Sequence, residues 1–172
     1  MARRRRGKPT PKKTPMPERP PEERVRDFLE VPLGYTPELA QREAQRCLMC
    51  PRPFCVEGCP VQIDIPAFID KVAQGDFLGA YLMIKETNYL PAICGRVCPQ
   101  EEQCEAKCVV GKRWEPVAIG RLERFAADYV AEHGLEPEPQ LPEPTGFKVA
   151  IVGSGPAGLT AAGLLASMGH KA

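Results

Sequence analysis

Eight cysteines fall into two groups whose spacing is typical of iron–sulfur binding. The first group is Cys47, Cys50, Cys55 and Cys59, whose members are separated by two, four and three residues. The second group is Cys94, Cys98, Cys104 and Cys108, whose members are separated by three, five and three residues. A 4Fe–4S cluster binds four thiolates, so eight cysteines predict two clusters. The bacterial ferredoxin run is C-x2-C-x2-C-x3-C-P, and the first group has this layout with two extra residues between its second and third cysteines.

The ferredoxin layout also predicts how the ligands divide. The fourth cysteine of such a run binds the other cluster, so we expect Cys47, Cys50 and Cys55 to share one cluster and Cys59 to serve the second. The second group supplies the missing ligands, and a count of cysteines includes Cys94 among them. Zinc is the main alternative because its four-cysteine sites also use C-x2-C spacing, but the second group has no such pair. Disulfides are disfavoured because they are rare in the cytoplasm.

A second motif, near the C-terminal end, has the spacing G-x-G-x-x-G. It consists of Gly153, Gly155 and Gly158, with Pro156 and Ala157 between the last two glycines. An apolar run over 147–152 predicts a buried strand before it, and an Ala/Leu-rich run over 159–168 predicts a helix after it. In dinucleotide-binding folds the first glycine permits a tight turn, the second lets the backbone approach a pyrophosphate, and the third lets helix and strand pack closely. The alternative is a turn that only packs a helix on a strand.

One part of the dinucleotide fingerprint is missing. An acidic residue about 20 positions after the glycines normally binds a ribose hydroxyl, but the sequence ends at Ala172. Because one strand and one helix cannot enclose a dinucleotide, we expect this chain to be the front portion of a longer polypeptide. On its own it is expected to bind flavin poorly or not at all.

Helical patterns must position both motifs. Apolar residues at intervals of three and four predict helices over 22–30, 36–48, 64–75, 77–86 and 119–133. Thr36 and Asp64 are predicted N-caps, and Gly75 and Gly134 are predicted helix stops. The second cysteine group is expected to form mostly short turns. The expected fold class is therefore mainly α, with a helical domain for two 4Fe–4S clusters followed by the first βα unit of a truncated Rossmann-like FAD-binding domain.

Composition divides the chain into four parts. Residues 1–20 form a tail with seven Lys or Arg in its first 13 positions, expected to be disordered; residues 21–134 form the helical cysteine-rich domain; residues 135–146 are a Glu/Pro linker; and residues 147–172 begin the next domain. The net charge of +1 argues against a nucleic-acid partner. With neither a secretory signal nor an apolar run of about 20 residues, we expect a cytoplasmic protein without a membrane span.

Together these motifs resemble a known protein family. The matching segments are RCLMC, CVEGCPVQIDIP, ETNYLPAICGRVCPQEEQCEAKC, EPVAIGRLERF and VAIVGSGPAGL. They are similar to the glutamate synthase small-subunit family, most of all to the FAD-containing large subunit of NADH-dependent reduced ferredoxin:NADP+ oxidoreductase, and also to the N-terminal part of dihydropyrimidine dehydrogenase. The resemblance spans residues 17–170. It implies a helical domain with two 4Fe–4S clusters, followed by FAD and NADPH domains, the latter wholly missing here.

The resemblance also implies a division of the ligands. One cluster would use Cys47, Cys50, Cys55 and Cys108, and the other would use Cys59, Cys98, Cys104 and a non-cysteine ligand at the position of Glu123. Cys94 would then be a small buried residue, although counting cysteines alone favours it as the eighth ligand. An alternative role for Glu123 is a surface salt bridge with Arg121 or Arg124.

The function implied by the resemblance is electron transfer within an NAD(P)H oxidoreductase. Members of the family receive hydride on FAD and pass single electrons through the clusters to a partner. That partner would be the rest of the polypeptide, a companion subunit, or an electron-accepting subunit such as the glutamate synthase large subunit or a ferredoxin-reductase-like subunit. The sequence shows no nucleophile, acid–base pair or triad, so no catalytic residue is expected and the 172-residue chain alone should be inactive. The alternative function is a non-enzymatic docking module held together by iron–sulfur clusters or zinc.

Overall fold

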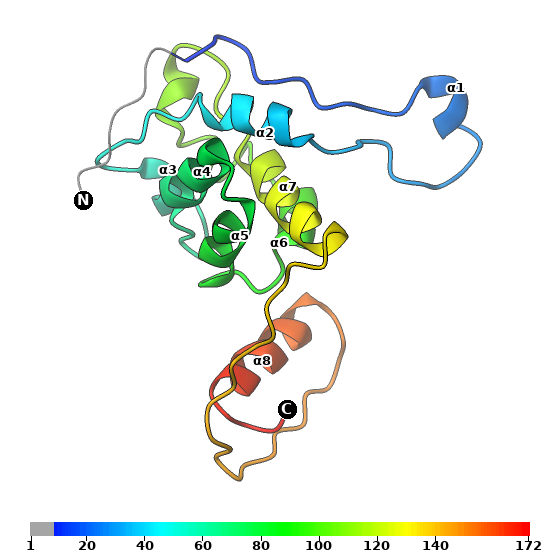
Figure 1. Ribbon diagram of the computed structural model, residues 1–172, viewed down its shortest axis with the longest axis vertical. Helices are drawn as coiled ribbons and strands as arrows, with labels where there is room; N and C mark the ends of the chain where they lie inside the picture. Colours follow the sequence, from blue (N-terminus) through cyan, green and yellow to red (C-terminus); the bar gives the residue numbers. More distant parts are fainter. Residues whose placement is uncertain (1–8) are drawn as a thin grey trace. The chain divides into compact units, whose positions relative to one another are not determined.

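The structure, a computed structural model, describes residues 9–172 (Figure 1). The chain divides into two compact units, Met1–Gly134 and Leu135–Ala172. The described residues are mainly helical, as the sequence predicts, and contain isolated β-bridges but no β-strand. In this part of the chain, no helix combines the length and the apolar character that crossing a membrane requires.

The first unit is built from short helices that pack on one another. Over the described range they are α1 (Pro21–Arg24), α2 (Pro37–Ala44), α3 (Phe54–Glu57), α4 (Ile65–Gln74), α5 (Phe77–Lys85), α6 (Pro91–Val97), the 3-10 turn η1 (Val109–Lys112) and α7 (Ile119–Glu132). Helix α6 packs on α7, and α4 packs on both α2 and α5. Helix α7 also contacts α5 and α4, so it lies at the centre of the unit (Figure 1).

Apolar faces of α4, α5 and α7 form the core of the first unit. Phe68, Ile69 and Val72 from α4 are almost fully buried, as are Ile84 from α5 and Leu122 from α7. Residues three and four apart lie on the same face of a helix, so each helix buries one continuous stripe. The helical spacing of apolar residues from which these three helices were predicted is confirmed.

Helix boundaries follow the predicted caps. The hydroxyl of Thr36 accepts a hydrogen bond from the backbone nitrogen of Leu39 at 3.4 Å, and a carboxylate oxygen of Asp64 accepts one from Ala67 at 3.2 Å. These side chains satisfy backbone donors that the first turn of a helix leaves unpaired. Helix α4 ends at Gly75, whose φ of 83° is the left-handed conformation expected of a helix stop.

The segment over 22–30 departs from its prediction. Only α1 is helical there, and Val25, Phe28 and Leu29, whose spacing predicted one apolar helix face, are exposed, Phe28 completely. Asp27 accounts for the change of direction, because both of its carboxylate oxygens accept hydrogen bonds from Arg19 at 2.7 Å. One of them also accepts from the backbone nitrogen of Leu29 at 2.9 Å. The segment therefore folds back on itself instead of continuing as a helix.

Helix α6 lies where the sequence predicted short turns. Pro91 occupies its first position, where the fixed φ of proline favours a helix start. Gly95 lets α6 approach α7 closely, since a Cβ built there would lie 2.6 Å from the backbone nitrogen of Arg124. The helix was missed because Cys94 and Cys98 are four residues apart, a spacing that fits a helix as well as a ligand-bearing turn.

The N-terminal segment differs from the disordered tail expected over 1–20. Residues 1–8, with much of the predicted basic charge, lie outside the described residues. Thr14, in contrast, is buried; its backbone nitrogen donates to Glu43 and its carbonyl oxygen accepts from the hydroxyl of Tyr35, both at 2.6 Å. Composition gives no sign of these contacts because the tail contributes backbone atoms to them.

The second unit contains the glycine-rich turn. Helix α8 (Pro156–Ser167) begins directly after Gly155, three residues before its predicted start. The run over 147–152 does not form the predicted strand within the described residues, and its pairing there is limited to a parallel bridge between Lys148 and Lys171. A strand needs a neighbour along its whole length to pair its backbone groups, and a single bridge does not provide one.

Candidate metal centre

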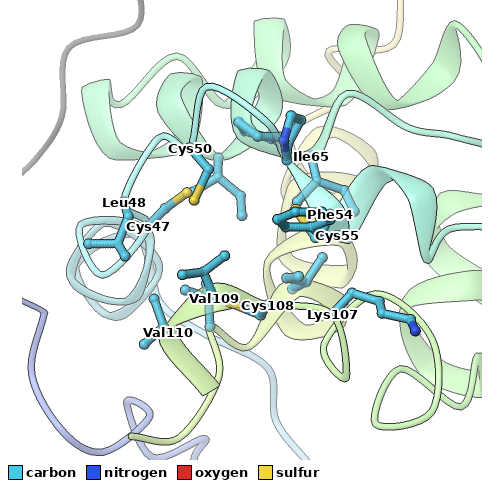
Figure 2. A pocket seen from close by; sticks show the side chains of 15 residues that line it. Cys47, Leu48, Cys50, Phe54, Cys55, Ile65, Lys107, Cys108, Val109 and Val110 are labelled. Carbon is cyan, nitrogen blue, oxygen red and sulfur yellow. The ribbon is translucent and has the colours of Figure 1, made fainter. Parts of the chain in front are cut away.

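One cavity of the first unit is lined by cysteines from both sequence groups. Cys47, Cys50, Cys55 and Cys108 surround it (Figure 2), and we call them the first cysteine set. None of the eight cysteines of the chain forms a disulfide. The fold thus brings together the four side chains that the family resemblance assigns to one cluster.

Short, tightly turned segments carry the first cysteine set. Cys47 follows the end of α2, Cys55 lies within α3, and Cys108 directly precedes η1. Between Cys47 and Cys50 the backbone of Met49 adopts a φ of 52°, in the left-handed region that residues with a side chain seldom occupy. Such local strain is found at binding sites, and here it turns the chain between two neighbouring thiols.

Apolar side chains form much of the remaining cavity wall. Ile65 and Ile69 from α4, Val117 just before α7 and Ile119 at its start are almost fully buried and line it. Lys107 adds one charged side chain to the wall (Figure 2). Apolar surroundings limit the access of water to a metal cluster and tune its reduction potential.

The thiols of the first set influence one another's ionisation. Burial raises the pKa of Cys55 to about 12, and the other three members of the set add to the shift, Cys108 most strongly. A thiol in such surroundings keeps its proton unless a cation compensates the charge of the thiolate. A bound metal would supply that compensation, because metal binding replaces the thiol proton. The set is therefore suited to holding a cationic centre.

A second cysteine set consists of Cys59, Cys98 and Cys104. Burial raises the pKa of Cys104, and Cys59 and Glu123 are among the neighbours that add to the shift. Burial also raises the pKa of Cys98 to about 11, and Cys94, Glu123 and Cys59 raise it further. Cys98 and Cys104 thus lie within electrostatic reach of both Cys59 and Glu123, the residue that the resemblance names as their fellow ligand.

Glu123 is a buried carboxyl group, so the alternative role in a surface salt bridge is wrong. Its side chain is 6% exposed, and its Oε1 accepts a hydrogen bond from Asn88 Nδ2 at 2.7 Å. Burial raises the pKa of Glu123 to about 7, while the hydrogen bond from Asn88 acts in the opposite direction. The Cys94 thiol donates to the Oδ1 atom of Asn88 at 3.5 Å. Both candidates for the eighth ligand therefore contact the same amide.

Gly58 lets the two cysteine-bearing segments approach each other. It lies between Cys55 and Cys59, and a Cβ built on it would be 2.7 Å from the carbonyl oxygen of Gln103 and 2.9 Å from the side chain of Lys107. Cβ atoms in proteins do not approach a backbone oxygen so closely, so any larger residue would push the segments apart. Sequence reasoning missed this role because a glycine among ligands reads as part of a flexible loop.

A buried ion pair that the sequence analysis did not single out supports the first set. Glu43 and Arg46 are at most 2% exposed and form a salt bridge of 2.7 Å. Glu43 also accepts from the backbone nitrogens of Thr14 and Ala118, at 2.6 and 2.9 Å. Because Arg46 directly precedes Cys47, this network fixes the start of the ligand loop. Its only signal in the sequence was the opposite charges at positions i and i+3 of a helix end.

Two glycines of the glycine-rich turn occupy positions that a larger residue would not fit. Gly153 has a φ of 110°, and a Cβ on Gly158 would lie 2.1 Å from the carbonyl oxygen of Gly153. A Cβ on Gly155 would meet no atom within 4 Å among the described residues. The first and third glycines thus serve the turn itself, and the second directly precedes α8.

No three Cys, His, Asp or Glu side chains within residues 9–172 converge closely enough to hold a single metal ion. A tetrahedral zinc site needs its ligands about 2.0–2.3 Å from one ion. A 4Fe–4S cluster makes a different demand, because each of its four irons takes its own protein ligand. The thiolates of such a set therefore lie at separate corners of the cluster.

Comparison with known proteins adds an independent finding. The family model described as dihydropyrimidine dehydrogenase domain II, 4Fe–4S cluster, matches residues 24–135. This range contains all eight cysteines, together with Asn88 and Glu123, and it ends before the glycine-rich turn.

Individual relatives agree with the family match. The glutamate synthase [NADPH] small chain of Escherichia coli K12 is 38% identical over 156 residues, 91% of this chain, and that of Azospirillum brasilense is 38% identical over 155 residues, 89% of this chain. The NAD-dependent dihydropyrimidine dehydrogenase subunit PreT of Escherichia coli O157:H7 is 41% identical over 141 residues, 82% of this chain. The chain spans about a third of the length of these relatives. The expected likeness to both kinds of protein is confirmed.

Proposed function

Because the chain belongs to the family of dihydropyrimidine dehydrogenase domain II, the 4Fe–4S cluster domain, we propose that its first unit holds two such clusters and conducts single electrons. The observation that carries this proposal is the division of the cysteines in space. Four surround one cavity. Of three others, Cys98 and Cys104 interact electrostatically with Cys59 and with a buried carboxyl group, and each set combines residues from both sequence groups. Two interleaved sets bring two clusters close together, as sequential electron transfer requires.

The proposed ligands follow these sets. The first cluster is held by the first cysteine set, and the second by the second cysteine set with Glu123. When bound, a 4Fe–4S cluster supplies reversible one-electron chemistry, and its potential depends on charge, hydrogen bonds and exposure. The protein contributes thiolates, a water-poor apolar wall beside the first cluster, and an oxygen ligand to the second. An oxygen ligand in place of one thiolate gives the two clusters different electronic surroundings.

The second unit supports the flavin part of the proposal. We assign the turn formed by Gly153, Gly155 and Gly158, with Pro156 and Ala157, to the diphosphate of FAD. The open backbone at Gly155 and the start of α8 suit an anionic group. This unit would be the beginning of a Rossmann-like domain in a longer polypeptide, which would also bind NAD(P)H.

The names of the relatives support a partner subunit. They are a small chain of glutamate synthase and a subunit of dihydropyrimidine dehydrogenase, so each works in an assembly with another chain. We therefore propose that the clusters link an FAD and NAD(P)H site to a companion redox subunit that accepts single electrons. The proposed activity is that of an oxidoreductase component, and the chemistry of the final substrate belongs to that companion.

A redox titration of the anaerobically purified chain tests the proposal. Electron paramagnetic resonance (EPR) spectra recorded during the titration should show reversible uptake of about two electrons per chain, one for each 4Fe–4S cluster. Cys55→Ser should reduce the uptake to about one electron, because the variant removes a ligand of the first cluster only. Cys94→Ser is the matched control, since it removes a thiol outside both sets and should leave the uptake unchanged.

Two results would contradict this function. A chain that contains zinc and takes up no electrons would support the non-enzymatic docking module instead. A chain that loses all electron uptake in Cys94→Ser would show that the proposed ligand sets are wrong.

A further inference from the structure

Asn88 is a buried polar residue that links three elements beside the second cysteine set. It lies in the connection between α5 and α6, it is 6% exposed, and its backbone nitrogen donates to the carbonyl oxygen of Ile84 at the end of α5. Its side-chain Nδ2 donates to Glu123 on α7 at 2.7 Å, and its Oδ1 accepts from the backbone nitrogen of Leu90, just before α6, at 3.0 Å. Because hydrogen bonds engage both the nitrogen and the oxygen of its amide group, the side chain of Asn88 has a fixed orientation.

The hydrogen-bond partners determine which way the amide points. The backbone nitrogen of Leu90 can only donate, so the atom of Asn88 that faces it must be the oxygen. The nitrogen then faces Glu123, whose carboxylate oxygen can accept in either protonation state. This orientation also directs the amide oxygen toward the thiol of Cys94. A single orientation of the Asn88 amide therefore accounts for its contacts with both Glu123 and Cys94.

Asn88 gives Glu123 a fixed outer partner. The bond from its Nδ2 engages Oε1, one of the two carboxylate oxygens of Glu123. The sulfur of Cys94 lies 3.5 Å from the Oδ1 atom of the same amide. Carboxylate ligands of metals are themselves usually hydrogen-bonded, and these outer partners orient them.

We propose that Asn88 is the positioning residue of the second cluster: it holds the carboxylate of Glu123 in the orientation in which Glu123 serves as the oxygen ligand. This inference rests on the proposed function, because it assumes that a cluster occupies the second site. It adds a specific outer partner for the proposed oxygen ligand.

Chelator-driven iron loss and EPR spectra of the anaerobically purified chain test the proposal. In Asn88→Ala, we expect iron to be held at the second cluster about 10- to 100-fold less tightly, as for other outer partners of metal ligands. The EPR signal of that cluster should change, whereas the signal and iron retention of the first cluster should not. Tyr35→Phe is the control, since it removes another buried hydrogen bond, to the carbonyl oxygen of Thr14, and should change neither cluster.

A double-mutant cycle separates positioning from general support of the fold. If Asn88 acts through Glu123, then Asn88→Ala should add little to the effect of Glu123→Gln. Fully additive effects, or a second-cluster signal that Asn88→Ala leaves unchanged, would overturn the proposal. Asn88→Ser, which keeps a small oxygen near the Leu90 nitrogen, carries the same test if Asn88→Ala does not fold. A wild-type chain with no 4Fe–4S signal would instead contradict the proposed function itself.

Discussion

At the scale of single residues, a buried ion pair helps to shape the first site. Glu43 and Arg46 join the N-terminal segment, the end of α2 and the residues before α7 through hydrogen bonds to backbone atoms. Removing one partner of such a pair leaves a buried charge without compensation, which costs far more than the pair itself contributes. The loop that begins at Cys47 depends on this network for its position.

Glu43→Ala is therefore expected to destabilise the first unit by about 3–5 kcal/mol. The measurement is the denaturant concentration at which cluster absorbance is lost under anaerobic conditions, which should fall markedly. Lys71→Ala is the matched control, because it removes an exposed salt bridge to Asp76, of a kind that contributes about 0–1 kcal/mol. An equal effect of the two substitutions would contradict the role given to the buried pair.

At the scale of elements, close approach between segments decides whether ligands from distant parts of the sequence meet. Gly58 lies against the backbone at Gln103, and Gly95 lies against the backbone at Arg124. The first contact joins the two cysteine-bearing segments. The second joins α6 to α7; Cys98 directly follows α6, and Glu123 lies in α7. Neither contact can accept a Cβ without movement of backbone.

Gly58→Ala should consequently lower the iron content of the purified chain at both sites. The added Cβ would separate the segment with Cys55 and Cys59 from the segment with Cys104 and Cys108, and each site takes ligands from both. Iron analysis of Gly111→Ala provides the comparison, because a Cβ at Gly111 would make only ordinary contacts of 3.5 Å or more. Wild-type iron content in Gly58→Ala would refute the role of this contact.

Sequence patterns predicted well those features that are set by neighbours along the chain. Helix faces, the caps at Thr36 and Asp64, and the stop at Gly75 depend on residues within a few positions, and the structure agrees with them. The end of α1 depends on the contact of Asp27 with Arg19, and the burial of Thr14 depends on Glu43 and Tyr35. These partners lie outside the segments whose patterns were read. For the same reason, spacing grouped Cys47, Cys50 and Cys55, but Asn88 became visible as a neighbour of Glu123 only in three dimensions.

At the scale of the whole chain, the two compact units divide the proposed work. The first contains every candidate cluster ligand, and the second contains the glycine-rich turn. Each unit has its own internal contacts, so the cluster sites do not depend on residues beyond Gly134 for their ligands. Electron transfer and flavin binding are thereby assigned to separable parts.

Deletion of residues 135–172 is thus expected to leave the clusters intact. Iron content, sulfide content and EPR spectra of the shortened chain should equal those of the full 172-residue chain, since all the proposed ligands lie within 47–123. Loss of either cluster on deletion would show that the second unit is needed to complete the first.

The central claim is that the cysteines form two separate cluster sites with the division 47, 50, 55 and 108 against 59, 98 and 104. Iron and acid-labile sulfide analysis, combined with Mössbauer spectra of the wild-type chain, Cys108→Ser and Cys104→Ser, tests it most directly. The wild type should contain about eight irons and about eight sulfides. Cys108→Ser should retain only the second 4Fe–4S cluster, and Cys104→Ser should retain only the first. If both variants lost the same cluster, or if the wild type contained zinc and no sulfide, the claim would be contradicted.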